Sequence, residues 1–187
     1  MKKIYEYSHL GGSEILKVNY PEIDAEIDDV IKRVSANHIK ESKEKTKLGQ
    51  MLISPIDLNN QFKRYFNQAG YNEIRDYYDI KIPNYEPVIS DSYKQIDFCK
   101  GKILVEVQFG KYAFMFYDMA KFQYFFNENK ANVGVEIVPC NELHREMSSG
   151  VSFGEQLVFD IERLKRNFPS VPVKVILIDQ DYFTKPE

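Results

Sequence analysis

The stretch QIDFCKGKILVEVQFG, residues 95–110, contains the features that decide the fold. Its apolar second half is interrupted by Glu106 and Gln108, and Gly101 marks a turn before it. Successive side chains of a strand point to opposite faces, so Glu106 and Gln108 share one face of a predicted strand. The turn folds the preceding strand back, and this hairpin brings Asp97 toward Glu106.

This geometry has a chemical consequence. Two carboxylates held close together on a rigid sheet repel each other unless a cation lies between them. Their oxygens are hard ligands, which suit Mg²⁺, and such a metal can polarise a phosphodiester and lower the pKa of a bound water. The spacing Asp97-x8-Glu106-x-Gln108 therefore indicates a metal-dependent phosphodiesterase site. The alternative is two ordinary strand carboxylates and an amide bonded to a neighbouring loop.

The remaining sequence predicts an α/β fold, with a mixed central β-sheet flanked by helices. Val173 to Ile178 is almost continuously apolar, as expected for a strand covered on both faces. Three further helices are predicted: one opened by Pro21, one from Ser54 and Pro55 to Gly70, and a buried aromatic one over 113–127. Residues 71–92 are predicted to form a loop, and Val133–Val138 a strand. A last helix is predicted to begin with a capping box of Ser152 and Glu155, and its inward side chains are those of Leu157, Ile161, Leu164 and Phe168.

Length and composition fit a single domain over residues 1–187, with 43% hydrophobic and 28% charged residues. No apolar run reaches the ~18 residues of a membrane span. The first residues lack the long apolar region of a secretory signal, and Cys99 and Cys140 have no CxxC partner. These features predict a cytoplasmic protein with free thiols and exclude a zinc ribbon.

The formal net charge of −3 argues against a protein that simply coats nucleic acid. Two basic clusters stand out, one around Lys43 and Lys45 and one over residues 163–166. They are either solvated helix faces or phosphate-contacting patches beside an acidic cleft. The three histidines are scattered, and neither Ser149 nor Ser152 lies in a Gly-x-Ser-x-Gly elbow, so a histidine metal site and a serine hydrolase are both disfavoured.

The pattern Asp-x8-Glu-Val-Gln-Phe resembles the catalytic signature of type II restriction endonucleases of the BglII group, within the larger PD-(D/E)xK nuclease fold. The similarity extends over most of the chain, although residues 71–93 do not align. It occurs in six blocks in the same order: YSHL at 7–10, ESKEKTKLGQ at 41–50, SPIDLNNQFK at 54–63, EVQFGKY at 106–112, VGVEIVP at 133–139 and EMSSGVS at 146–152.

The resemblance implies a Mg²⁺-dependent homodimer that cuts both strands of a palindromic double-stranded DNA site. It assigns Asp97, Glu106 and the carbonyl of Val107 to the metal, and gives Gln108 the task of positioning the attacking water. A lysine usually occupies the position of Gln108 in the larger superfamily. The amide therefore excludes the lysine-based account of water activation.

The resemblance also implies two DNA-reading segments. Lys111 and Tyr112 follow the catalytic strand, and Ser148, Ser149 and Gly150 belong to a loop before a later helix. The alternative for the loop is a simple cap for that helix. The implied target is centred on GATC, with a purine first and a pyrimidine last, and a companion DNA methyltransferase is expected to protect the host.

Three functions remain open at this level. The first is a type II restriction endonuclease, the second a repair or recombination nuclease of the same fold that cleaves by structure, and the third a DNA-binding module without catalysis. Digestion of a plasmid with and without Mg²⁺ distinguishes the three.

Overall fold

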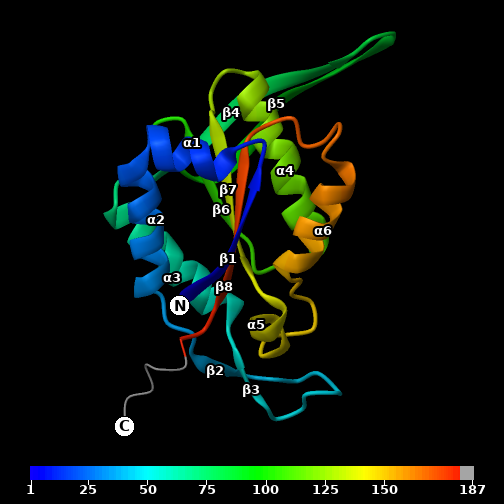
Figure 1. Ribbon diagram of the computed structural model, residues 1–187. Helices are drawn as coiled ribbons and strands as arrows, with labels where there is room; N and C mark the ends of the chain where they lie inside the picture. Colours follow the sequence, from blue (N-terminus) through cyan, green and yellow to red (C-terminus); the bar gives the residue numbers. More distant parts are fainter. Residues whose placement is uncertain (182–187) are drawn as a thin grey trace.

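A mixed β-sheet runs through the centre of this computed structural model, which describes residues 1–181 (Figure 1). Its strands are β1 (Lys2–His9), β4 (Asn72–Ile82), β5 (Tyr85–Lys100), β6 (Ile103–Val107), β7 (Val133–Pro139) and β8 (Val173–Asp179). They lie in the order β1-β8-β7-β6-β5-β4. The central strands β6, β7 and β8 are parallel, whereas β1, β5 and β4 run antiparallel to their neighbours. The predicted mixed sheet is thereby confirmed.

Helices cover both faces of the sheet (Figure 1). One side carries α1 (Gly12–Asn19), α2 (Pro21–Arg33) and α3 (Pro55–Gln68), and the other carries α4 (Tyr112–Asn127) and α6 (Gly154–Leu164). At one end, the short α5 (Asn141–Arg145) lies near a separate two-stranded sheet of β2 (His38–Glu41) and β3 (Met51–Ile53). At the other end, the β4–β5 hairpin extends beyond the body of the molecule. No helix within residues 1–181 is long and apolar enough to cross a membrane.

The helices predicted from local signals are confirmed. Pro21 is the first residue of α2. Ser54 caps α3, since its hydroxyl accepts a hydrogen bond from the Asp57 backbone N–H. Gly70 follows the end of α3 with a φ of 85°, a conformation that glycine adopts without steric cost. The strands predicted from Val133 and from Val173 are β7 and β8.

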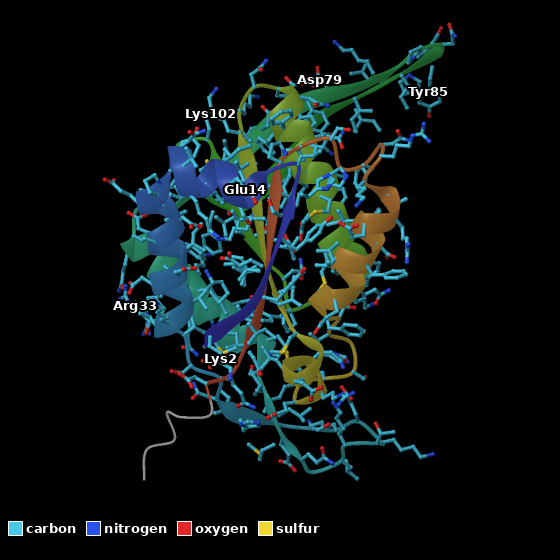
Figure 2. All side chains as sticks on the ribbon, in the orientation of Figure 1. Lys2, Glu14, Arg33, Asp79, Tyr85 and Lys102 are labelled. Atoms are coloured by element: carbon cyan, nitrogen blue, oxygen red, sulfur yellow. The ribbon has the colours of Figure 1, made fainter. Side chains whose placement is uncertain are left out.

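The loop predicted over residues 71–92 is wrong, because these residues form most of the β4–β5 hairpin. One face of β4 packs on α4: the rings of Tyr78 and Tyr124 are 5.9 Å apart, and the Tyr124 hydroxyl donates to Asp76 at 2.7 Å. The other face is exposed. The partly buried positions of β4 are Ile74, Asp76, Tyr78 and Ile80, so a carboxylate interrupts the apolar period that identifies a strand in the sequence. Figure 2 shows Asp79 and Tyr85 on the part of the hairpin that extends beyond the body of the molecule.

The capping box of Ser152 and Glu155 is also wrong. Helix α6 begins at Gly154, and its cap residue Phe153 makes no side-chain hydrogen bond to it. The Glu155 carboxylate instead accepts the N–H of Asn141 at 3.0 Å, and the Ser152 N–H donates to the carbonyl of Gly110. The sequence analysis also did not identify β1, α1, β2, β3 and α5, and it placed Leu164 inside although this side chain is exposed.

Candidate active site

The β5–β6 hairpin places the two predicted metal ligands together. Its antiparallel register pairs Cys99 with Leu104 and Phe98 with Val105. The same register, continued by one residue, places Asp97 opposite Glu106. Directly opposite residues of an antiparallel pair point to the same face of the sheet, so both carboxylates lie on one side.

Helix α4 supplies two further charged groups to Glu106 and Gln108. The Lys121 ammonium contacts Glu106 Oε1 at 2.5 Å and Asp118 Oδ1 at 2.7 Å. The Gln108 amide Nε2 donates to the other Asp118 oxygen at 3.1 Å. Glu106 and Asp118 are buried, and the Lys121 side chain is only 14% exposed. The catalytic strand is thus connected to one turn of α4 by charge-assisted hydrogen bonds.

A third carboxyl group comes from β7. Glu136 pairs in parallel register with Glu106, so the two side chains lie next to each other on one face. Glu136 is fully buried, and neither carboxylate oxygen has a hydrogen-bond partner among residues 1–181. The cluster therefore holds three buried carboxyl groups and one ammonium.

The pKa values of the carboxyl groups in this cluster are raised, as expected where buried carboxyl groups outnumber the ammonium groups. Burial, followed by the charge of Asp118, raises the pKa of Glu106 despite the opposing effect of Lys121. Burial, with Asp118 and Glu106 nearby, raises the pKa of Glu136 well above its ordinary value. Burial alone would lower the pKa of Lys121, but the surrounding carboxylates outweigh it and raise that pKa. An additional cation would stabilise the ionised form of this cluster.

Asp97 is exposed and lies at the rim of a pocket of about 680 Å³, which is lined by residues of α3 and the start of β4 and does not include Glu106. Val107 and Glu73 line the same pocket. Gln95 connects the two acidic residues, since its amide donates to Glu73 at 2.9 Å and lies 3.5 Å from Asp97. The pocket gives an external ligand direct access to Asp97.

The donor set fits a hard divalent cation. Asp97, Glu106 and the Val107 carbonyl would provide oxygen ligands, which Mg²⁺ prefers. Within the described part of the chain, no group of three or more Asp, Glu, His or Cys side chains is arranged to hold a metal. A cation that keeps several waters and binds substrate phosphate as well, as Mg²⁺ usually does, suits this incomplete set. The oxygens of Glu136 beside Glu106 have no hydrogen-bond partner among the described residues, and a bound cation would favour the ionised form of this carboxyl group.

The two predicted DNA-reading residues after the catalytic strand have different environments. Lys111 is exposed and directly precedes α4. Tyr112 is half-buried, and its hydroxyl donates to the carboxylate of Asp160 on α6. The structure therefore leaves Lys111 accessible and anchors Tyr112 within the protein.

The predicted DNA-reading loop around Ser148 is held by the segment that connects β2 and β3. Lys40 donates to the Ser148 hydroxyl at 2.6 Å, and the carboxylate of Glu44 accepts the Ser149 N–H at 3.1 Å. Lys47 donates to the carbonyl of Met147 at 2.6 Å. Two loops far apart in the sequence thus form one surface, and the remaining predicted DNA-contact residues on it, Gly150, Lys43 and Lys45, are exposed.

The sequence analysis missed Asp118, Lys121 and Glu136, although each left a signal. Glu136 interrupts the apolar stretch VGVEIVP in the same way that Glu106 interrupts ILVEV. Asp118 and Lys121 are three residues apart in an otherwise aromatic helix, so they lie on one face. Glu73 was missed because its strand was assigned to a loop.

Comparison with known proteins independently indicates the family of this chain. Residues 4–178 match the family model of restriction endonuclease BglII/BglIII. The crystal structure of BglII complexed with a DNA 16-mer matches with a TM-score of 0.75 and 23% identity, covering 97% of this chain and 78% of that one. Free BglII matches with a TM-score of 0.68 and 21% identity, covering 97% and 82%.

The two structural matches share the fold, whereas no curated protein sequence matches significantly. The match to the family model includes β6, the first turns of α4 and the loop around Ser148. The chain therefore belongs to the restriction endonuclease BglII/BglIII family.

Proposed function

We propose that this site-specific endonuclease is a type II restriction enzyme that uses Mg²⁺ to hydrolyse one phosphodiester bond in each strand of a palindromic DNA duplex. The observation that carries the proposal is the β5–β6 hairpin: its pairing reaches Phe98 and Val105, next to Asp97 and the buried Glu106, and the charge of Asp97 acts on Glu106. The fold is shared with BglII. The family match supports the same activity.

Asp97, Glu106 and the carbonyl of Val107 would hold the metal. When bound, Mg²⁺ would polarise the scissile phosphodiester and lower the pKa of the attacking water. Gln108 carries no ionisable proton, so its part is to position that water through hydrogen bonds. A substrate phosphate is then the proton acceptor.

The proposed assembly is a homodimer. Two identical subunits related by a twofold axis present the same surface to each half-site, so they read a palindrome. The matched BglII structure is a complex with DNA, which supports double-stranded DNA as the substrate. We further propose that residues 1–187 form one endonuclease domain, that the enzyme acts in the cytoplasm, and that a companion methyltransferase protects the host DNA.

The sequence blocks also resemble those of BstYI, and this resemblance supports a target centred on GATC, with a purine first and a pyrimidine last. Purines share the N7 acceptor in the major groove, so a single donor can accept either A or G. Lys111 is an exposed flexible point donor without the fork geometry of arginine, which suits such a contact. Ser148, Ser149 and Gly150 would read further edges, and Lys43 and Lys45 would contact phosphates.

Digestion of a plasmid with and without Mg²⁺ tests the activity. We expect discrete fragments with Mg²⁺ and intact plasmid without it. Nicking that follows DNA structure would instead support a repair nuclease, and binding without cutting would support a non-catalytic module.

Cleavage of a library of randomised hexamers tests the target. We expect cutting at GATC-centred sites, and Lys111→Ala should lose about 1–3 kcal/mol of discrimination at the bases that Lys111 contacts. Cutting without a GATC preference would contradict the target, and unchanged selectivity in Lys111→Ala would contradict the role of this lysine.

A further inference from the structure

The turn of α4 that contains Asp118 and Lys121 contacts both polar residues of the catalytic strand. We propose that Asp118 and Lys121 are positioning residues: Asp118 fixes the orientation of the Gln108 amide, and Lys121 fixes the carboxylate of Glu106. This inference rests on the proposed function of the same site and adds two residues to its machinery. It also brings a lysine into the site from a helix, although the expected strand position holds Gln108.

The contact with Asp118 selects one orientation of the Gln108 amide. An amide has a donor end and an acceptor end, and a carboxylate can accept only from the donor end. The Nε2 group donates to Asp118 at 3.1 Å. The acceptor Oε1 is therefore directed away from Asp118, and an acceptor is what a water needs when it donates a proton during positioning.

Gly110 makes room for this orientation. A Cβ at position 110 would lie 2.5 Å from Gln108 Oε1, which is closer than nonbonded atoms approach each other. Any larger residue at position 110 would push the amide oxygen out of its place. The Gln108 amide is thus held at its donor end by Asp118 and bounded at its acceptor end by Gly110.

The contact with Lys121 acts on Glu106 in a similar way. The ammonium lies between Glu106 Oε1 and Asp118 Oδ1, and its side chain is 14% exposed. It engages one oxygen of Glu106 and leaves the second one for a cation. One ammonium cannot neutralise three buried carboxyl groups, so its geometric effect is to fix Glu106 and Asp118 relative to each other.

A matched pair of variants tests the role of Asp118. Asp118→Asn keeps an acceptor oxygen for Gln108, whereas Asp118→Leu has a similar volume and no acceptor. In single-turnover cleavage of plasmid at saturating Mg²⁺, we expect Asp118→Leu to lose roughly 10- to 100-fold, the scale known for residues that orient metal ligands. Asp118→Asn should recover part of the rate, because its single oxygen can accept from Gln108 while the ion pair with Lys121 is lost.

A double-mutant cycle separates positioning from general damage. If Asp118 acts through Gln108, the loss caused by Asp118→Leu becomes clearly smaller in a Gln108→Ala background, and the remainder reflects its contact with Lys121. Fully additive losses would overturn the proposal. Should Asp118→Leu fail to fold, Gly110→Ala provides the same test, since it displaces Gln108 Oε1 and leaves Asp118 intact. Its loss should likewise vanish in the Gln108→Ala background.

Lys121 is tested by Lys121→Met and Lys121→Arg. We expect Lys121→Met to lower the single-turnover rate without weakening DNA binding in the absence of metal, and Lys121→Arg to restore part of the rate. Equal losses in both variants, or a loss of DNA binding in Lys121→Met, would overturn the role of Lys121.

A readout without metal or DNA keeps this inference separate from the proposed function. In the NMR spectrum of the metal-free protein, one side-chain amide proton of Gln108 should be displaced from its position in a free glutamine amide, because it is bonded to Asp118. This displacement should persist in Asp118→Asn and be lost in Asp118→Leu. An identical amide signal in both variants would overturn the positioning role, whereas a wild-type protein that cuts no DNA would refute only the proposed function.

Discussion

Two charge clusters lie on the same sheet, and the pKa values of their carboxyl groups shift in opposite directions. Between β1, β8 and α2, the fully buried Lys174 ammonium contacts Asp24 at 2.6 Å and Glu6 at 2.7 Å. Lys3 and Lys17 also reach Glu6, and Lys3 contacts Asp28 at 2.7 Å. This cluster holds three ammonium groups and three carboxylates. The catalytic cluster holds one ammonium, Lys121, among three buried carboxyl groups.

The pKa shifts have opposite directions in the two clusters. Burial alone would raise the pKa of Glu6, but hydrogen bonds from Lys174 and Lys3 outweigh it and lower that pKa to about 2. In the catalytic cluster burial prevails, and the pKa values of Glu106 and Glu136 are raised. The comparison teaches that a partly exposed carboxylate with several ammonium partners stabilises the fold, whereas deeply buried carboxyl groups that share one ammonium favour an external cation.

The largest expected effect is on the cleavage rate, when a carboxylate of the candidate active site is removed. Asp97→Asn and Glu106→Gln should each reduce cleavage to background, because each removes an anionic ligand that the cation needs. Both should retain DNA binding, since less negative charge faces the phosphates. Glu106→Gln should also unfold at a higher temperature, because burial disfavours the ionised carboxylate, as its raised pKa reflects, and the amide carries no charge. Full cleavage by either variant at saturating Mg²⁺ would contradict the metal site.

The cluster around Lys174 has equal numbers of ammonium and carboxylate groups, so removing one of its charges should lower the stability of the fold. Lys174→Met leaves Glu6 and Asp24 without their buried partner, and breaking a buried ion pair in this way typically costs about 3–5 kcal/mol of unfolding free energy. Urea unfolding measures the loss. Lys165→Met is the matched control, because the ion pair of Lys165 with Glu162 is exposed and such pairs contribute about 0–1 kcal/mol. Equal losses in the two variants would remove the distinction between the clusters.

A smaller effect is expected at the uncharged member of the site. Gln108→Ala should lower the cleavage rate by roughly 10²-fold, the scale associated with misplacing a reactant. Gln108→Glu should keep part of the rate, because a carboxylate can still position a water. Single-turnover kinetics measure both variants. An unchanged rate in Gln108→Ala would remove this residue from the mechanism.

The smallest effect concerns acid stability. The pKa of Glu6 is lowered from 4.5 to about 2 in the folded protein, so its stabilising contribution is present above pH 4.5 and is lost as the pH falls from 4.5 toward 2. The raised pKa of Glu136 acts in the opposite direction, since the folded state then binds its proton more tightly than the unfolded state. Urea unfolding between pH 5 and 2 should show a shallower acid loss in Glu6→Gln than in the wild type, and equal slopes would contradict this assignment.

The elements that were predictable depend on local signals. Helix α3 was identified from Ser54 and Pro55 because a cap and a first-turn proline act within a few residues. The β4–β5 hairpin was not identified, because the alternation of partly buried and exposed side chains along β4 arises from packing on α4, a distant segment of the sequence. Helix α6 was identified, but its start was misplaced because Asn141 of a different helix takes the Glu155 carboxylate.

The same distinction applies to the active site. Asp97, Glu106 and Gln108 lie within one hairpin, so their proximity could be predicted from spacing. Lys121 reaches Glu106 from a separate helix, and Glu136 reaches it from a strand that becomes its neighbour only in the folded sheet. Polar residues inside apolar stretches indicated candidate site residues in the sequence. Only the tertiary fold decides which of these residues contact one another.

The pairing of β1 with β8 has a consequence for the synthesis of the enzyme. Residues Lys2 to His9 pair with Val173 to Asp179, so β1 finds its neighbour only after more than 160 further residues have been translated. Until then β7 lacks its partner β8, and Glu6 and Asp24 lack Lys174. A nascent chain on the ribosome therefore cannot complete the sheet that supports the nuclease site. An endonuclease that can damage the genome of its own cell thus acquires its finished sheet only after β8 has left the ribosome.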